Sequence, residues 1–232
     1  MTRQLGARAP LILAIYGLTL LALMVPVVAY ELQGTRVRYL FLDPASAVGA
    51  PFYLGLFSQL GLLLWCVAAA ISLFTSCFLR RINRQPDSAR LLLCFGLLTS
   101  LLLFDDLLML HEEVIPTYGY IPEPVVLGFY GALALVCVAW FRRTLMKTGS
   151  WFLLLAIAFF AGSLMFDVQE RVYESIPEDG LKLLGIVTWT IYLVRTSFAS
   201  LASAVAPAAE ALSSRLEPIV FHYRAEKSER PL

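Results

Sequence analysis

Residues 91–113 read LLLCFGLLTSLLLFDDLLMLHEE, and this stretch decides the fold. Its first 14 residues, 91–104, carry no charge, and with Asp105 and Asp106 included the apolar run extends to His111. The hydrocarbon core of a bilayer is about 30 Å thick, and about 20 helical residues cross it. Residues 91–111 therefore predict one membrane-spanning helix with two carboxylates inside it.

The composition of the whole chain agrees with a membrane protein. Of the 232 residues, 59% are apolar and 15% are charged, and the mean hydropathy is +0.75. A soluble domain has about 45–50% apolar and about 25% charged residues. The 18 basic and 17 acidic residues leave a net charge of only +1, which argues against nucleic-acid binding through a basic face.

Apolar runs of spanning length predict the architecture. Six runs qualify, at residues 11–30, 52–79, 91–111, 124–141, 151–170 and 181–203. The predicted fold is all-α, a polytopic membrane helix bundle of six transmembrane helices over residues 1–203, with a C-terminal tail at 204–232. The first run also resembles a secretory signal, but its apolar stretch of 18 residues exceeds the usual ~7–15, which favours a retained helix.

The distribution of basic residues predicts the orientation. With six helices, 14 of the 18 basic residues fall on the side that holds both termini. The positive-inside rule then places the N-terminus, the C-terminus and the tail in the cytoplasm. We expect an integral protein of a bacterial-type inner or plasma membrane, with membrane lipid and either a protein partner or a second copy of the chain as its partners.

Acidic residues gather on the opposite, outer side. Twelve of the 17 lie there, and Asp105, Asp106 and Asp167 lie roughly 5–10 Å below the predicted membrane surface. An ionised carboxylate at that depth is costly unless it faces protein, water or a cation, or takes up a proton. These acids therefore indicate a functional site.

Helical spacing groups the candidate site residues into two stripes. Asp105 and Glu112 are seven residues apart and share a predicted helix face, and Asp167 and Glu174 repeat this spacing. At an offset of 62 residues Phe104-Asp105 also aligns with Phe166-Asp167, by duplication or by chance. The predicted cation-binding residues are Asp105, Asp106, His111, Glu112, Asp167, Glu170 and Glu174. The predicted metal ligands are Asp105, His111, Glu112, Asp167 and Glu170.

Carboxylates with one imidazole suit a divalent metal ion or a proton, and three functions are compatible with them. The first is binding of a cation or proton in transport. The second is a scaffold or accessory subunit whose acids pair with a partner's bases or with Arg171 and Lys182. The third is a metal-dependent hydrolase acting on a membrane lipid, with Glu112 or Glu170 as general base. No catalytic residue is assigned, because no nucleophile motif is present.

Overall fold

The structure is a computed structural model of the chain. It describes residues 41–167 and 176–228, together with residues 13, 16–21, 23–24 and 28. Half of the first predicted span, 11–30, lies outside the described residues. The described chain divides into two compact units, Met1–Leu56 and Phe57–Leu232. The short helix α2 (Pro44–Ala47) belongs to the first unit, and the candidate site belongs to the second.

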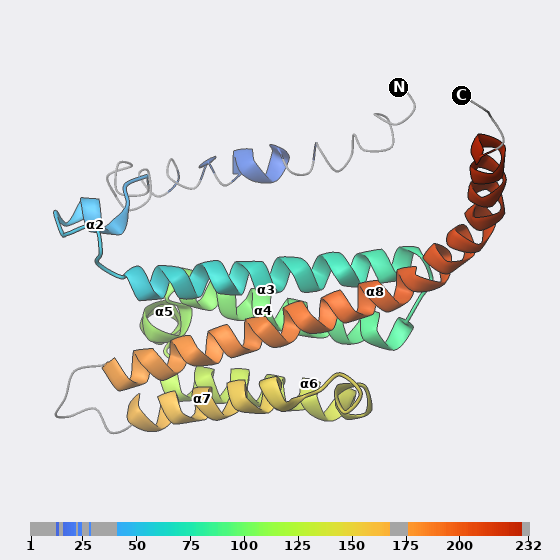
Figure 1. Ribbon diagram of the computed structural model, residues 1–232. Helices are drawn as coiled ribbons and strands as arrows, with labels where there is room; N and C mark the ends of the chain where they lie inside the picture. The colour runs from blue at the N-terminus through green and yellow to red at the C-terminus, as the bar shows by residue number, and fades with distance from the viewer. Residues whose placement is uncertain are drawn as a thin grey trace. The chain divides into compact units, whose positions relative to one another are not determined.

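Every regular element among the described residues is helical. After α2, the elements are α3 (Leu56–Arg81), α4 (Pro86–Leu108), the π-helix η2 (Leu110–Val114), α5 (Ile115–Gly119), α6 (Glu123–Leu145), α7 (Trp151–Asp167) and α8 (Ile176–Ser228). The five long helices of the second unit lie side by side with alternating direction (Figure 1).

The residues at the helix ends explain where these helices begin and stop. Pro86 and Asp87 occupy the first turn of α4, and Glu123 and Pro124 that of α6. A proline without its N–H fits the first turn, and a carboxylate there faces the positive end of the helix dipole. Arginine pairs close α3 and α6, where a positive charge is favourable.

Four of these helices are long and apolar enough to cross a membrane, as the sequence predicted for their regions. They cover Leu56–Arg81, Pro86–Leu108, Glu123–Leu145 and Glu178–Pro207. Helix α7 lies in the fifth predicted run, 151–170, but its apolar part, Trp151–Phe166, is shorter than the four candidate spans. The chain is thus an all-helical protein of membrane type, while a count of six spans and the cytoplasmic termini stay predictions. Helix α8 continues through Ser203 to Ser228, and the boundary between bundle and tail also stays a prediction.

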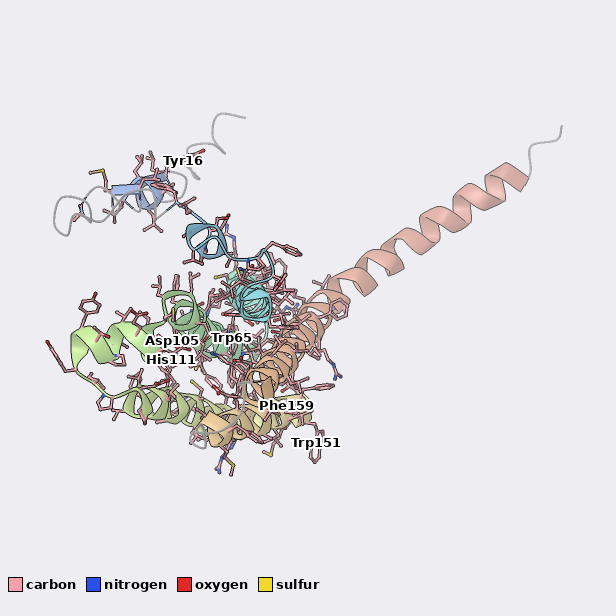
Figure 2. All side chains as sticks on the ribbon, turned by 90° about the vertical axis from the view of Figure 1, so that its left-hand side faces the viewer. Tyr16, Trp65, Asp105, His111, Trp151 and Phe159 are labelled. Carbon is pink, nitrogen blue, oxygen red and sulfur yellow. The ribbon has the colours of Figure 1, made fainter. Side chains whose placement is uncertain are left out.

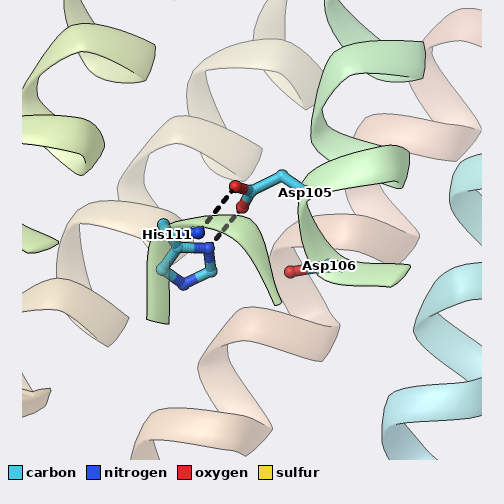
Figure 3. A group of neighbouring side chains, drawn as sticks. All are labelled: Asp105, Asp106 and His111. Carbon is cyan, nitrogen blue, oxygen red and sulfur yellow. Dashed lines mark hydrogen bonds and ion pairs between the residues drawn. The ribbon is translucent and has the colours of Figure 1, made fainter. Parts of the chain in front are cut away.

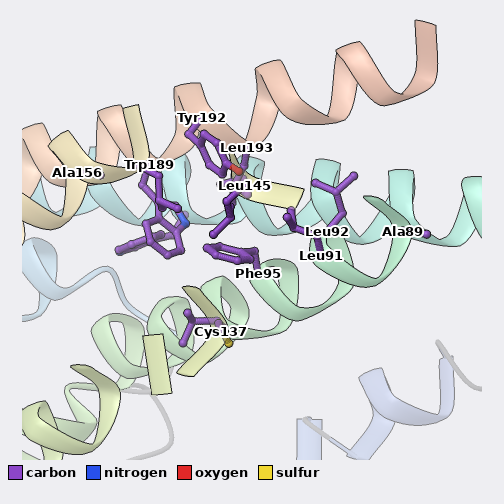
Figure 4. Close-up of a cluster of buried hydrophobic side chains, with 14 of the residues drawn as sticks. Ala89, Leu91, Leu92, Phe95, Cys137, Leu145, Ala156, Trp189, Tyr192 and Leu193 are labelled. Carbon is purple, nitrogen blue, oxygen red and sulfur yellow. The ribbon is translucent and has the colours of Figure 1, made fainter. Parts of the chain in front are cut away.

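The core of the second unit contains buried side chains from all five long helices, and its largest rings come from α3, α4 and α8. Trp65, Phe95, Trp189 and Tyr192 are buried there, and the Trp189 ring lies 5.5 Å from Phe95 and 6.2 Å from Trp65 (Figure 4). The Trp189 Nε1–H donates to Thr99 Oγ1 at 2.9 Å, so its only polar group is satisfied inside the core. This packing fixes the first half of α8 against α3 and α4.

The end of α4 departs from the prediction. Helix α4 stops at Leu108, because Met109 adopts a left-handed conformation with φ 51° and ψ 44°. The chain then restarts as η2, whose five residues include His111 and Glu112. The structure therefore corrects the predicted 91–111 helix: Asp105 and Glu112 do not share one continuous helix face.

We expect Met109 to be a position where glycine is more favourable than a β-branched residue. A left-handed conformation costs a residue with a Cβ roughly 1–2 kcal/mol, and glycine avoids this cost. Met109→Gly should therefore unfold at a higher temperature than Met109→Val in detergent. At the neighbouring helical position the order should reverse, with Leu108→Val more stable than Leu108→Gly. The same order at both positions would contradict the break at Met109.

Candidate cation site

Asp105 is the most buried carboxylate of the candidate site, with 3% of its surface exposed. It lies in the last turn of α4, and the backbone N–H of Met109 donates to its carbonyl oxygen. The left-handed residue Met109 interrupts the helix, and His111 in the following η2 lies against the Asp105 carboxylate (Figure 3). The local backbone, and not helical periodicity, thus brings these two residues together.

Three groups bond the Asp105 carboxylate. The backbone N–H of His111 donates to Asp105 Oδ1 at 3.1 Å, and the Tyr130 hydroxyl on α6 donates to the same oxygen at 2.8 Å. The His111 ring bonds Asp105 Oδ2 through Nδ1. Both His111 and Tyr130 are buried. The carboxylate therefore has partners for both oxygens, which offsets the cost of its burial.

Asp106 has a separate set of partners from two other helices. The Trp65 Nε1–H on α3 donates to Asp106 Oδ2 at 2.9 Å. The Lys182 ammonium on α8 lies 3.0 Å from Asp106 Oδ1. The side chains of Asp106 and Lys182 are 16% and 35% exposed, so this ion pair is partly shielded from solvent. It joins the first turns of α8 to the end of α4.

The electrostatic surroundings of His111 favour its charged form. Burial acts to lower the His111 pKa, but the hydrogen bond and negative charge of Asp105 outweigh it. Lys182 also lowers the pKa, and Glu112 raises it. The net result is a His111 pKa above its ordinary value of 6.5. Glu112 Oε1 lies 3.4 Å from His111 Nε2, so the imidazole lies between two carboxylates.

The arrangement brings three potential metal ligands together. Asp105, Asp106 and His111 each offer one ligand atom, and these atoms all lie within 4.8 Å of one another. Viewed with the bundle turned by 90°, Asp105 and His111 lie among the packed helices, whereas Trp151 projects from the outer side of α7 (Figure 2). Two carboxylates and an imidazole are a donor set that could hold a divalent ion.

The structure describes only part of the predicted site. It unites Asp105, Asp106 and His111, with Glu112 beside them and 46% of its side chain exposed. Asp167 ends α7, but its side chain lies outside the described residues, as do Glu170 and Glu174. The second predicted stripe therefore stays a prediction.

The sequence reasoning missed two of the residues that hold the acids in place. Trp65 and Tyr130 are 41 and 25 residues away from the carboxylates that they bond, and both stand in ordinary apolar runs. No local pattern reveals such contacts. Lys182 carried a usable signal, because it is the one base near the start of an apolar helix on the acidic side, and its pairing with an acid was among the alternatives.

The comparisons with known proteins identify a family. One family model, "Domain of unknown function (DUF8692)", matches residues 11–196. No curated protein matches the chain. No solved structure matches it. The matched region contains helices α3 to α7 and the first part of α8. It therefore includes Asp105, Asp106 and the residues that contact them. Because the match covers well over half of its length, the chain belongs to the DUF8692 family.

Proposed function

We propose that this chain is an integral membrane protein that binds a divalent cation through Asp105, Asp106 and His111. The observation that carries the proposal is the approach of three ligand atoms to within 4.8 Å of one another at the end of a membrane-length helix. Ionisable side chains in or beside membrane spans are costly and mark ion pathways or binding sites. Glu112, beside His111, could complete the coordination.

The charge at this end of the bundle supports cation binding. Among the described side chains of α4, η2, α6 and α8, seven acids lie at this end against one lysine, Lys182, and one histidine, His111. The acids are Asp105, Asp106, Glu112, Glu113, Glu123, Glu178 and Asp179. A surface with this excess of negative charge raises the local concentration of cations. A divalent ion entering the cluster would neutralise carboxylates that otherwise depend on hydrogen bonds.

The hydrogen bonds around the acids prepare them to act as ligands. Tyr130 and the His111 backbone hold the Asp105 carboxylate in one orientation, and Trp65 does the same for Asp106. Partners of this kind orient ligand groups before the ion arrives and strengthen binding.

Lys182 is the group that a cation has to displace. Its ammonium lies against Asp106 Oδ1 and supplies a positive charge where a metal would bind. Loss of the Lys182–Asp106 contact would free one carboxylate oxygen and remove a repulsive charge. Occupancy of the site is thereby linked to the first turns of α8.

The second candidate function is that of a scaffold or accessory subunit. The observation that favours it is that both acids already have a basic partner within the chain. Lys182 neutralises Asp106, and His111 pairs with Asp105. In this case the network joins α3, α4, α6 and α8 and needs no metal. Breaking a shielded ion pair by removing one partner is then destabilising, because the other charge is left unpaired.

Metal content distinguishes the two candidates. The protein is purified in detergent, loaded with Mn²⁺, Zn²⁺ or Ca²⁺, dialysed and measured by elemental mass spectrometry. We expect about one metal ion per chain in the wild type and in Asp87→Asn, which changes an exposed acid at the opposite end of α4. Asp105→Asn should lose the metal, because a neutral amide is a weaker ligand. A folded wild type without metal under all three conditions favours the scaffold.

Removing the Lys182 charge should strengthen metal binding. Lys182→Gln eliminates a positive charge within contact of Asp106, so we expect the metal dissociation constant to fall by roughly tenfold or more. Lys147→Gln is the matched control, since Lys147 follows α6 at the other end of the bundle. Isothermal titration calorimetry with the metal ion gives the dissociation constants of the wild type and of both variants. Equal affinities in wild type and Lys182→Gln would contradict the displacement of Lys182 by the metal.

The transport form of the proposal has its own test. If bound cations cross the bilayer, proteoliposomes containing the wild type should accumulate the metal that the purified protein binds. Asp105→Asn should abolish this uptake, and Asp87→Asn should retain it. Binding without uptake would limit the function to cation binding and exclude the transport form.

A further inference from the structure

A cavity of about 680 Å³ lies at the end of the second unit opposite the acids. Its walls come from the start of α4, the connection after α6 and the middle of α8. The polar residues that line it are Gln85, Ser88, Lys147, Thr148, Arg195, Thr196, Ser200 and Ser203. Val194 and Phe198 add an apolar side. The cavity thus combines two cations, several hydroxyls and an apolar surface, none of which the cation site uses.

The two bases that line this cavity are Lys147 and Arg195. Among the side chains that the structure describes, neither Lys147 nor Arg195 forms an ion pair. The Arg195 guanidinium instead lies 4.8 Å from the centre of the Phe152 ring, a contact that positions the group and leaves its charge uncompensated. Asp87 is the one acid among the described side chains at this end. The cavity therefore has a surplus of positive charge.

The position of the cavity along the helices corresponds to the membrane surface. Ser88 lies in the first turn of α4, and Lys147 follows the last residue of α6 by two positions. Arg195 and Ser203 belong to the last part of the candidate span Glu178–Pro207. Two of the three walls are thus at ends of membrane-length helices, where lipid headgroups meet the protein, and the α8 residues line the same cavity at that level.

Hydrogen bonds hold the polar wall in place. Thr148 Oγ1 lies 3.0 Å from the Tyr192 hydroxyl, which ties the connection after α6 to α8. Gln85 at the start of α4 donates to Ser203 Oγ on α8. The cavity is therefore braced from two sides, and its shape does not depend on the exposed bases alone.

We propose that this cavity binds the phosphate headgroup of an anionic membrane phospholipid. Lys147 and Arg195 neutralise the phosphate charge, and the hydroxyls of Ser88 and Ser200 are within the same cavity to donate hydrogen bonds. The exposed Phe198 side chain continues the apolar wall toward an acyl chain. A phospholipid fits this combination better than free phosphate, because phosphate uses only the polar half of the cavity.

Native mass spectrometry of the full-length protein in detergent tests the proposal. The protein is titrated with phosphatidylglycerol, with phosphatidylcholine and, separately, with millimolar inorganic phosphate as a competitor. Each base near an anionic surface is worth about fivefold in affinity, so Lys147→Gln/Arg195→Gln should bind phosphatidylglycerol roughly 25-fold more weakly. The matched control is Arg142→Gln/Arg143→Gln, which removes the same charge from exposed residues of α6 that do not line the cavity.

The wild type and the control should both prefer phosphatidylglycerol to phosphatidylcholine, and the cavity variant should lose this preference. Equal weakening by both double variants would overturn the proposal, because binding would then follow total charge. Complete displacement of the lipid by inorganic phosphate would overturn it in favour of a free anion. If the double variant does not fold, the single variant Lys147→Glu replaces it, because Lys147 is an exposed residue after α6. Lys147→Glu should abolish the preference for phosphatidylglycerol. A preference that persists in this variant would also overturn the proposal.

Discussion

The burial of the Asp105 carboxylate at the end of an apolar helix is the constraint on which the rest of the second unit depends. Asp105 is satisfied only because the Tyr130 hydroxyl approaches from α6 and His111 folds back from η2. The second contact requires α4 to stop at Met109 in a left-handed conformation. A strained residue at the end of a membrane helix is thus explained by the bonds that it makes possible, and strain of this kind commonly occurs at functional sites.

Asp106 extends this constraint to the remaining helices. Its contacts with Trp65 and Lys182 connect α4 to α3 and α8. The ring packing around Trp189 connects the same three helices about two turns further along α8 and about three turns back along α4. Helix α7 packs closely against α8 at Gly185. A Cβ at this position would lie only 2.7 Å from the Phe160 ring of α7, so glycine permits the close approach. A change at Asp106 therefore acts on the packing of α8, and a change in α8 acts on the site.

The two ends of the bundle have opposite charge and different chemistry. At the acidic end, carboxylates and an imidazole converge, and hydrogen bonds from neutral groups keep them ordered. At the basic end, Lys147 and Arg195 line a cavity, and neither forms an ion pair with any side chain that the structure describes. In a membrane this polarity has two consequences: cations are attracted at one surface, and anionic headgroups are attracted at the other. The cation and lipid proposals follow from this asymmetry but depend on separate residues.

Composition and apolar run length alone determined the helical membrane class and the approximate place of four spans, because hydrophobic length can be read residue by residue. The cost of burying charge also singled out Asp105, Asp106 and His111 as candidate site residues, and the structure brings these three together. The sequence could not predict the break at Met109, since backbone conformation there is set by contacts six residues apart. It also could not predict Trp65 and Tyr130 as partners. Only the tertiary structure decided these partners, because hydrogen bonds between helices depend on how the helices pack. The residues that neighbour Trp65 or Tyr130 in the sequence do not indicate that packing.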